Sequence, residues 1–468
     1  MNGGYGILAL IPPILAIGLA FWKKQLLASL FLGIWLGEIL IAKGNVFSGF
    51  VSTVGRALRV TRAPGNLEII VFSLLIGGFL ALIREAGGFQ GFVEWAERRR
   101  LSGRGPVFGL TFLIGLCLFI ENYSNILING STMRPLFDKL RISRERLGYF
   151  IHTTSINVVA LVVINSWGAF YMSLLQTQGV SQPLKVIVGS LPLNFYCLAS
   201  LVLVLVVMAT GWTFGPMKIA EKTANQAGGR PEEIPGISPA DIGSHFKSIP
   251  ARAFHMVFPI AVLLVSVLLS LYLTGHGHIS QGDGAPSVLY GVAVGILAMG
   301  GLLLVKRLFR LQDLMDILFR GIAELIPVGI LLVLALTLGD LCKALGTGTF
   351  LAGLAKEHLP TAVLPALVFG LSCVISFATG TSYGTFAIMI PIALPMAQAT
   401  GLSQSLMFAA CISGGVFGDN CSPISDTSIV TGMAARISVV DHTRTQIPYA
   451  LVAASVAIVL YVLVGLLG

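Results

Sequence analysis

Long apolar stretches separated by short polar or basic segments run along the whole chain. Because a bilayer core about 30 Å thick needs roughly 20 apolar residues per helix, these stretches predict membrane-spanning α-helices. The stretches continuous enough to be complete spans are 5–21, 25–42, 67–83, 189–211, 254–274, 286–305, 322–340 and 447–467. The pattern therefore predicts an all-α polytopic membrane protein.

Four other segments are too polar for lipid-facing helices and too apolar for loops: 106–133, 147–175, 362–397 and 405–435. Non-helical backbone at membrane depth is tolerated only where protein or a water-filled cavity surrounds it. We therefore predict re-entrant hairpins at 106–133 and 362–397, each followed by a helix interrupted midway. Together with the complete spans, this gives about ten spans plus two hairpins.

The segment 212–253 is rich in charge, Pro and Gly and predicts a cytoplasmic linker. It separates a first half, 1–211, from a second half, 254–468, with the same order of spans, hairpin and interrupted helix. Landmarks such as Ser124 and Ser382 recur at an offset of roughly 260 residues. Since the second half starts from the opposite side of the membrane, we expect two inverted repeats with a transport site near the midplane.

Composition supports a membrane protein. Only 11% of the 468 residues are charged and 55% are hydrophobic, whereas soluble domains carry about a quarter charged residues. This excludes a soluble enzyme, a disordered protein and a nucleic-acid binder. The net charge of +9 comes largely from basic clusters between spans. Because cytoplasmic loops are enriched in Lys and Arg, we expect a multi-pass protein of the inner (plasma) membrane, partnered by the lipid bilayer, with both termini outside.

Polar residues gather in the four broken segments, where burying them is costly and therefore indicates function. In the second half the candidates are Thr379, Thr381, Ser382, Tyr383, Asp419, Ser422, Ser425 and Asp426. In the first half they are Glu121, Asn122, Ser124, Asn125, Asn157, Asn165 and Ser166. Carboxylates, hydroxyls and unwound backbone at half-helix ends supply oxygen ligands for a small hard cation.

Asp419 and Asp426 predict a sodium site. A desolvated carboxylate can hold either a proton or a sodium ion, and each displaces the other. We expect at least one of the two aspartates to be proton-linked, and we also consider Glu121 and His152 as proton-linked groups. The alternative for Asp426 is a structural ion pair with Arg436 or Arg444.

Several further charged or titratable residues have more than one interpretation. For His152, a hydrogen-bonded or interfacial role is as compatible with the sequence as proton gating near neutral pH. The run Asp441–His442–Thr443–Arg444 is typical of a solvated, helix-capping cytoplasmic turn. Glu38 and Asp340 lie near span ends, which favours snorkelling or helix-end roles. We predict an amphipathic interfacial helix for the segment that carries Arg56, Arg59 and Arg62.

The run Gly380–Thr381–Ser382–Tyr383–Gly384 matches the G-x-S-x-G nucleophile elbow of hydrolases. That elbow requires a strand–turn–helix context with His and acid partners. Here the run lies in a membrane segment with no strand pattern nearby, so we expect a transporter and not an enzyme.

The stretches FATGTSYGTFAIMIPIALPMA (377–397), GGVFGDNCSPISDTSIVTG (414–432) and DHTRTQIPYAL (441–451) resemble the NhaC-type sodium/proton antiporters of the ion transporter superfamily. LGDLCKALGTG (338–348) and NSWGAF (165–170) are similar too. The resemblance implies scaffold and transport domains, a homodimer, an elevator-like movement, and sodium as the transported or coupling ion without an organic cofactor. The positions that match the family's hairpin and broken-helix motifs are Thr379, Thr381, Ser382, Asp419, Ser422 and Asp426.

The first half departs from that family. The family usually has paired aspartates where this chain has Glu121–Asn122, often an Asp at the position of His152, and a Pro at that of Asn157. Sodium/proton antiport is the leading prediction. The alternative is sodium-coupled transport of a small amine- or amino-acid-like solute, whose binding would use the first-half amides and hydroxyls together with Tyr383.

Overall fold

The computed structural model describes residues 5–467 except for 24, 64, 98–102, 120–121, 227–249, 279–281, 348–349, 351–352 and 354–359. Throughout these described residues the regular elements are helices, and no strand occurs among them. The predicted all-α class is therefore confirmed.

The first half of the chain, up to the linker, is a series of helices. They are η1 (Gly6–Leu10), α1 (Ile11–Lys23), α2 (Leu26–Ile41), α3 (Val46–Thr61), α4 (Asn66–Glu85), α5 (Gly88–Glu97), α6 (Arg104–Cys117), α7 (Asn122–Lys139), α8 (Arg144–Leu161), α9 (Ser166–Thr177), α10 (Pro183–Ser190), η2 (Leu191–Leu193) and α11 (Phe195–Thr210).

The linker contributes one described helix, α12 (Pro216–Gln226), which packs on α8 and on the last helix of the chain. The second half follows with α13 (Phe254–Thr274), α14 (Gly284–Val305), α15 (Leu311–Glu324), α16 (Ile326–Leu345), η4 (Thr361–Val363), α18 (Leu364–Thr379), α19 (Ser382–Thr400), α20 (Gln404–Cys421), α21 (Asp426–Ala435) and α22 (Val439–Leu467).

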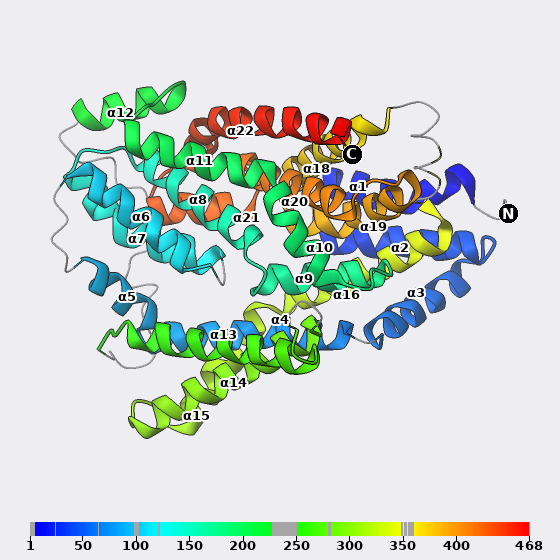
Figure 1. The fold of residues 1–468 in the computed structure, drawn as a ribbon, viewed down its shortest axis with the longest axis horizontal. Coiled ribbons are helices and arrows are strands. Elements are labelled where there is room, and N and C mark those ends of the chain that lie inside the picture. Colours follow the sequence, from blue (N-terminus) through cyan, green and yellow to red (C-terminus); the bar gives the residue numbers. More distant parts are fainter. Residues whose placement is uncertain are drawn as a thin grey trace.

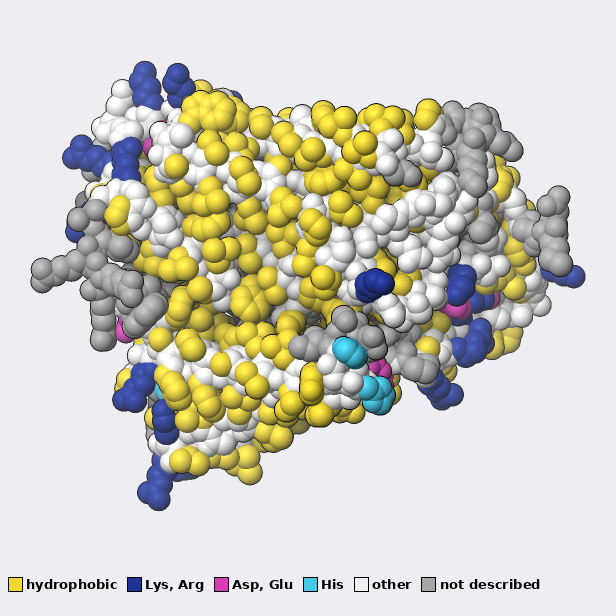
Figure 2. Space-filling view, viewed as in Figure 1, with side chains coloured by type: hydrophobic (Ala, Val, Ile, Leu, Met, Phe, Trp, Pro, Cys, Tyr) yellow, Lys and Arg dark blue, Asp and Glu magenta, His cyan; other side chains and the backbone are white. Residues whose placement is uncertain are grey.

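Six of the described helices are long and apolar enough to cross a membrane, and the number rises to nine if each of three bent helix pairs counts as one span. The protein is thus a multi-pass membrane protein. Most helices run along the long axis of the molecule (Figure 1). Hydrophobic side chains cover much of the middle of the visible face, and most of its visible Lys and Arg side chains lie toward the two ends (Figure 2).

Both predicted interrupted helices are present. Helices α8 and α9 are bent by 43° at residues 162–165, and residues 422–425 separate α20 from α21. The turns of the two predicted hairpins also fall where expected, between α6 and α7 and between α18 and α19. The arms extend beyond the predicted ends, because α7 continues to Lys139 and α19 to Thr400. Whether the hairpins are re-entrant stays a prediction.

Helix starts recur between the two halves. The first residues of α7, α8 and α9 are 122, 144 and 166, and those of α19, α20 and α21 are 382, 404 and 426, so each pair differs by 260. The caps correspond as well, since Ser143 accepts from the backbone N–H of Arg146 and Ser403 from that of Leu406. The halves therefore share their order of elements, and their inversion stays a prediction.

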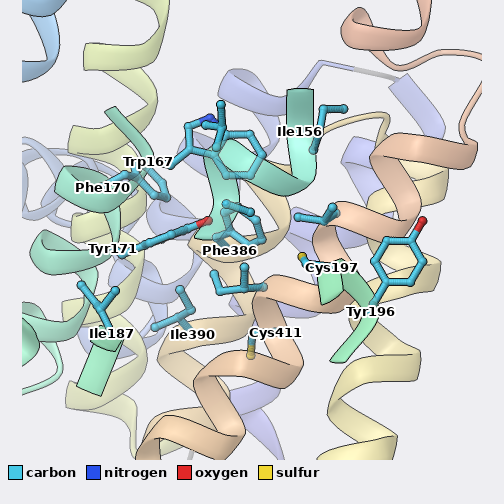
Figure 3. Packing of buried hydrophobic residues seen from close by; sticks show 14 of the residues in the cluster. Ile156, Trp167, Phe170, Tyr171, Ile187, Tyr196, Cys197, Phe386, Ile390 and Cys411 are labelled. Carbon is cyan, nitrogen blue, oxygen red and sulfur yellow. The ribbon is translucent and has the colours of Figure 1, made fainter. Parts of the chain in front are cut away.

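The interior between α9, α19 and α20 is an aromatic and aliphatic core (Figure 3). Tyr171 of α9 lies edge-on to Phe386 of α19 and to Phe408 of α20, with ring centroids 5.5 and 5.3 Å apart. Trp167, 1% exposed, completes the cluster. This packing fixes the first broken helix against the second hairpin.

The predicted helix that carries Arg56 is α3, which is bent by 118° from α2. Its apolar side chains Phe47, Val51 and Leu58 are exposed, whereas Arg56 is buried. Arg56 pairs with both Glu38 of α2 and Asp340 of α16. Snorkelling is therefore wrong for Glu38, which is 2% exposed and pairs inside the protein, whereas Asp340 is 39% exposed and lies near the end of α16.

Candidate ion-binding site

The break between α20 and α21 lies between the turns of the two hairpins. Helix α20 packs against α18 and α19, while α21 packs against α7 and α8. At the second hairpin, Gly380 has φ of +67°, a left-handed conformation that suits glycine. A Cβ atom there would lie 2.7 Å from the carbonyl oxygen of Ile424, so glycine also permits the close approach of the hairpin turn to the break.

Asp419 lies in the last turn of α20 and is 2% exposed. Its Oδ2 accepts a hydrogen bond from Ser382 Oγ at 2.9 Å, at the start of α19. Its Oδ1 accepts from Ser425 Oγ in the break and from Thr427 Oγ1 at 3.0 Å. A buried carboxylate is costly unless hydrogen bonds or a cation compensate it, and here the compensation in the described structure comes from hydroxyl groups.

Asp426, the first residue of α21, has a different environment. Asp426 is exposed, and its side chain accepts hydrogen bonds from Tyr123 Oη at 2.5 Å and from the backbone N–H of Thr427 at 2.7 Å. The ion pairs of the described residues include none between Asp426 and Arg436 or Arg444. The structural ion-pair alternative therefore has no support.

The remaining predicted second-half residues organise the backbone around Asp419. Thr381 caps α19 by accepting from the Gly384 N–H at 3.3 Å. Ser422 Oγ accepts from the Ile424 N–H at 3.4 Å inside the break, after which Pro423 prevents α20 from continuing. Thr379 Oγ1 donates to the Ile375 carbonyl within its own helix. Of the predicted set, Ser382 and Ser425 are the residues whose hydroxyls contact Asp419.

The first-half amides mostly hold backbone. Asn165 caps α9 by accepting from the Gly168 N–H at 2.9 Å, and it donates to the Val159 carbonyl at the end of α8. Asn125 Nδ2 donates to Gly115 and Leu118 carbonyls across the first hairpin. Asn157 Nδ2 donates to the Thr153 carbonyl at 2.7 Å.

Further first-half candidates lie at the turn of the first hairpin and the start of α7. The backbone carbonyl of Asn122 accepts from Ser155 Oγ at 3.1 Å. Glu121 and the side chain of Ser124 lie outside the described residues.

Tyr383 connects the two halves of the site. Its hydroxyl donates to Ser166 Oγ at 3.3 Å, at the start of α9. Its ring packs on Trp167 and Phe170, with centroids 5.3 and 4.9 Å away. Tyr383 thus packs against the broken helix of the first half and not only within its own hairpin.

His152 is fully buried in α8, so it is not interfacial. Its Nε2 lies 3.0 Å from Thr427 Oγ1, and its Nδ1 lies 2.9 Å from Nε2 of His442. The prediction of a solvated turn at 441–444 is wrong, because these residues form the first turns of α22. Asp441 and Arg444 are exposed, whereas His442 is 0% exposed.

Sequence reasoning missed Thr427 and His442. A usable signal was present, because His442, Gln446 and Ala450 recur at four-residue spacing and all three lie on the buried face of α22. Thr427 lies one residue beyond Asp426 in the same motif.

The donor set suits an alkali cation better than a transition metal. Among the described residues no group of three or more His, Cys, Asp and Glu side chains could hold a metal ion. A carboxylate with hydroxyls and an unwound backbone, as around Asp419, is the kind of oxygen site that secondary transporters use for sodium.

The helices and this break define a multi-pass membrane protein with paired broken helices. The profile of the Na+/H+ antiporter family matches residues 158–466, and the chain belongs to that family. Its membership and fold make the protein a secondary transporter of the antiporter kind.

Relatives and solved structures are similar over different shares of the chain. An uncharacterized protein of Haemophilus influenzae is 29% identical over 98% of this chain and 90% of its own length. The arginine/ornithine antiporter ArcD of Halobacterium salinarum is 26% identical over 45% of this chain and 42% of its own. The YdaH transporter of Alcanivorax borkumensis has the same fold, with a TM-score of 0.58 at 15% identity over 96% of this chain and 98% of its own.

Proposed function

We propose that this protein is a sodium/proton antiporter of the inner membrane in which Asp419 binds sodium and a proton in turn. The observation that carries the proposal is the buried carboxylate of Asp419, held by hydroxyls from α19 and from the break. In the hydroxyl-bonded state the hydrogens point at the carboxylate. When sodium enters, Ser382 and Ser425 would rotate these hydrogens away and offer oxygen lone pairs to the ion.

Competition at one carboxylate gives obligatory exchange. Burial disfavours a bare negative charge, so Asp419 is most stable with either a proton or a sodium ion. If the site opens to one side at a time, each sodium ion carried in one direction is matched by a proton carried in the opposite direction. Asp426 is exposed at the far side of the break, at the start of α21. Its negative charge would draw cations toward the site.

An elevator-like movement of one part of the chain against another is also proposed. Helices α4, α5, α13, α14 and α15 contact one another and lie together to one side of the hairpins and broken helices (Figure 1). This grouping and the family resemblance support a scaffold and a transport domain. The resemblance also supports a homodimer, which light scattering in detergent tests by a protein mass of twice 49.6 kDa.

Transport by reconstituted protein tests the exchange. Proteoliposomes with an internal pH dye should show proton movement when an opposed sodium gradient is applied, without any organic solute. Asp419→Asn should abolish that signal, while Asp441→Asn, at an exposed position on α22, should keep it. Sodium-independent proton movement, or full activity in Asp419→Asn, would refute the assignment.

A second candidate is sodium-coupled transport of an amine- or amino-acid-like solute. The exposed Asp426 with Tyr123 against it would suit an ammonium group, and a partial relative is named as an arginine/ornithine antiporter. Uptake of labelled arginine, ornithine and lysine under a sodium gradient distinguishes the two functions. Accumulation of a solute that fails without sodium would favour this candidate over antiport.

A further inference from the structure

A continuous row of polar atoms leads away from Asp419 through the protein interior. Thr427 Oγ1 lies 3.0 Å from Asp419 Oδ1 and 3.0 Å from His152 Nε2. His152 Nδ1 lies 2.9 Å from His442 Nε2. Each of these side chains is at most 2% exposed. The row runs from the break before α21, across α8, to the first turns of α22.

The far end of the row is unusual for a purely structural histidine pair. His442 Nδ1 is buried, and within the described part of the chain it has no hydrogen-bond partner. Gly148 faces it, and a Cβ atom there would lie 2.9 Å from Nδ1, so glycine is what allows the ring to pack this closely. An orphaned buried nitrogen costs free energy, which a transient proton donor would relieve. The preceding residue, Asp441, is exposed.

His152 has a partner in either tautomer. When Nδ1 is bare, it accepts the Nε2–H of His442. When Nδ1 carries the hydrogen, it can donate to Gln446 Oε1, 3.3 Å away. Gln446 is itself held by Asn420, next to Asp419. The imidazole can therefore switch tautomer without losing its hydrogen bonds.

We propose that His442, His152 and Thr427 form a proton relay between Asp419 and the end of the molecule where α22 begins. This inference rests on the proposed proton exchange at Asp419. A proton that arrives at His442 Nδ1 releases the Nε2 proton to His152 Nδ1. His152 passes its Nε2 proton to Thr427 Oγ1, and Thr427 passes its hydroxyl proton to Asp419 Oδ1. One proton enters and one reaches the carboxylate, so the relay residues end neutral with their tautomers reversed.

The relay passes between charged groups but is not ion-paired. The titratable or charged residues on or next to the described elements that pack against α8, α21 and α22 are Arg104, Cys117, Tyr123, Arg134, Asp138, Lys139, Arg144, Glu145, Arg146, Tyr149, Tyr171, Tyr196, Cys197, Lys218, Glu221, Lys222, Cys373, Cys411, Asp419, Cys421, Asp426, Arg436, Asp441, Arg444, Tyr449 and Tyr461. None of the ion pairs among the described residues includes His152 or His442. Neutral imidazoles are what tautomer exchange requires.

Measuring two transport modes distinguishes the role of the relay from that of the sodium site. Sodium/proton exchange needs proton delivery, whereas exchange of labelled sodium for unlabelled sodium at equal concentrations needs the sodium site alone. His442→Gln should lower sodium/proton exchange at least tenfold and leave sodium/sodium exchange within twofold of the parent protein. His255→Gln is the matched control, because His255 is also buried and bonds the Ala86 carbonyl outside the row. It should change neither mode.

Further variants keep the test decisive if His442→Gln fails to fold. Gly148→Ala, which presses a methyl group against His442 Nδ1, should slow the proton mode selectively. His442→Gly should regain proton exchange when imidazole is added. Equal loss of both modes in folded variants would make the pair structural, and unchanged proton exchange would remove it from the path. If the parent protein shows sodium/sodium exchange but no proton exchange, the proposed function itself fails.

Discussion

Asp419 and Asp426 are seven residues apart in the sequence, yet their surroundings differ in kind. Asp419 is buried and accepts hydrogen bonds from hydroxyl groups. Asp426 is exposed and accepts from the Tyr123 hydroxyl and from the backbone N–H of Thr427. Burial of the Asp419 side chain disfavours a bare negative charge there, and the hydroxyl groups around it can serve a cation instead. We therefore assign the exchange of sodium and proton to Asp419 and give Asp426 an electrostatic part.

Loss of either hydroxyl next to Asp419 tests this assignment. Ser382→Ala and Ser425→Ala should each weaken apparent sodium affinity, because each removes one oxygen from the cation and one donor from the carboxylate. A loss of about 1–2 kcal/mol corresponds to about 5- to 30-fold. The concentration dependence of sodium-driven proton movement measures it.

The matched control for these variants is Thr385→Val. Its hydroxyl is also buried and lies one turn further along α19, where it bonds the Thr381 carbonyl and not Asp419. Sodium affinity that falls equally in all three variants would show a general effect of losing a buried hydroxyl and count against direct contact.

At the scale of elements, the sequence predicted the breaks better than the contacts between helices. Polar clusters with Gly or Pro, such as those at Gly380 and Pro423, mark interrupted helices by local chemistry alone. The partners of Arg56 could not be predicted in this way. Glu38 is 18 residues away and Asp340 is 284 residues away, and only tertiary packing brings the three helices together.

The Arg56 ion pairs should stabilise the packing of α2, α3 and α16. In Arg56→Gln the Glu38 carboxylate, 3% exposed, stays buried without its cation. Removing one member of a buried pair typically costs about 3–5 kcal/mol, and the lower end applies because Asp340 is 39% exposed. Thermal unfolding in detergent should show a clear decrease in Tm.

Arg59→Gln provides the comparison, because Arg59 is exposed on the same helix. An unchanged Tm in Arg56→Gln, or the same decrease in both variants, would mean that the buried ion pairs do not stabilise this region.

At the scale of the whole molecule, the apolar periodicity and the basic segments predicted a multi-pass helical protein, and that much is confirmed. The recurrence of helix starts at an offset of 260 residues agrees with the predicted repetition. Span counting was less exact, because helices such as α2 and α3 bend sharply where the sequence is still apolar. The hydropathy of a segment indicates whether it is buried, but it does not indicate where the helix axis changes direction.

Thiol labelling tests the predicted membrane orientation at this scale. With both termini outside, a cysteine at exposed Lys222 in the linker helix should react with an impermeant thiol reagent from the cytoplasm. A cysteine at exposed Arg59 should react from the outside. In right-side-out cells Arg59→Cys should label and Lys222→Cys should not, and the opposite result would reverse the orientation.

The most direct measurement of the central claim is proton release by the purified protein when sodium binds. Sodium added to a weakly buffered solution of the protein in detergent should displace a proton from Asp419, and a pH indicator should report acidification. Apparent sodium affinity should weaken as the pH falls, because protons then compete for the same carboxylate. Asp419→Asn should abolish the release. Sodium binding without any proton release, or with undiminished release from Asp419→Asn, would contradict the account.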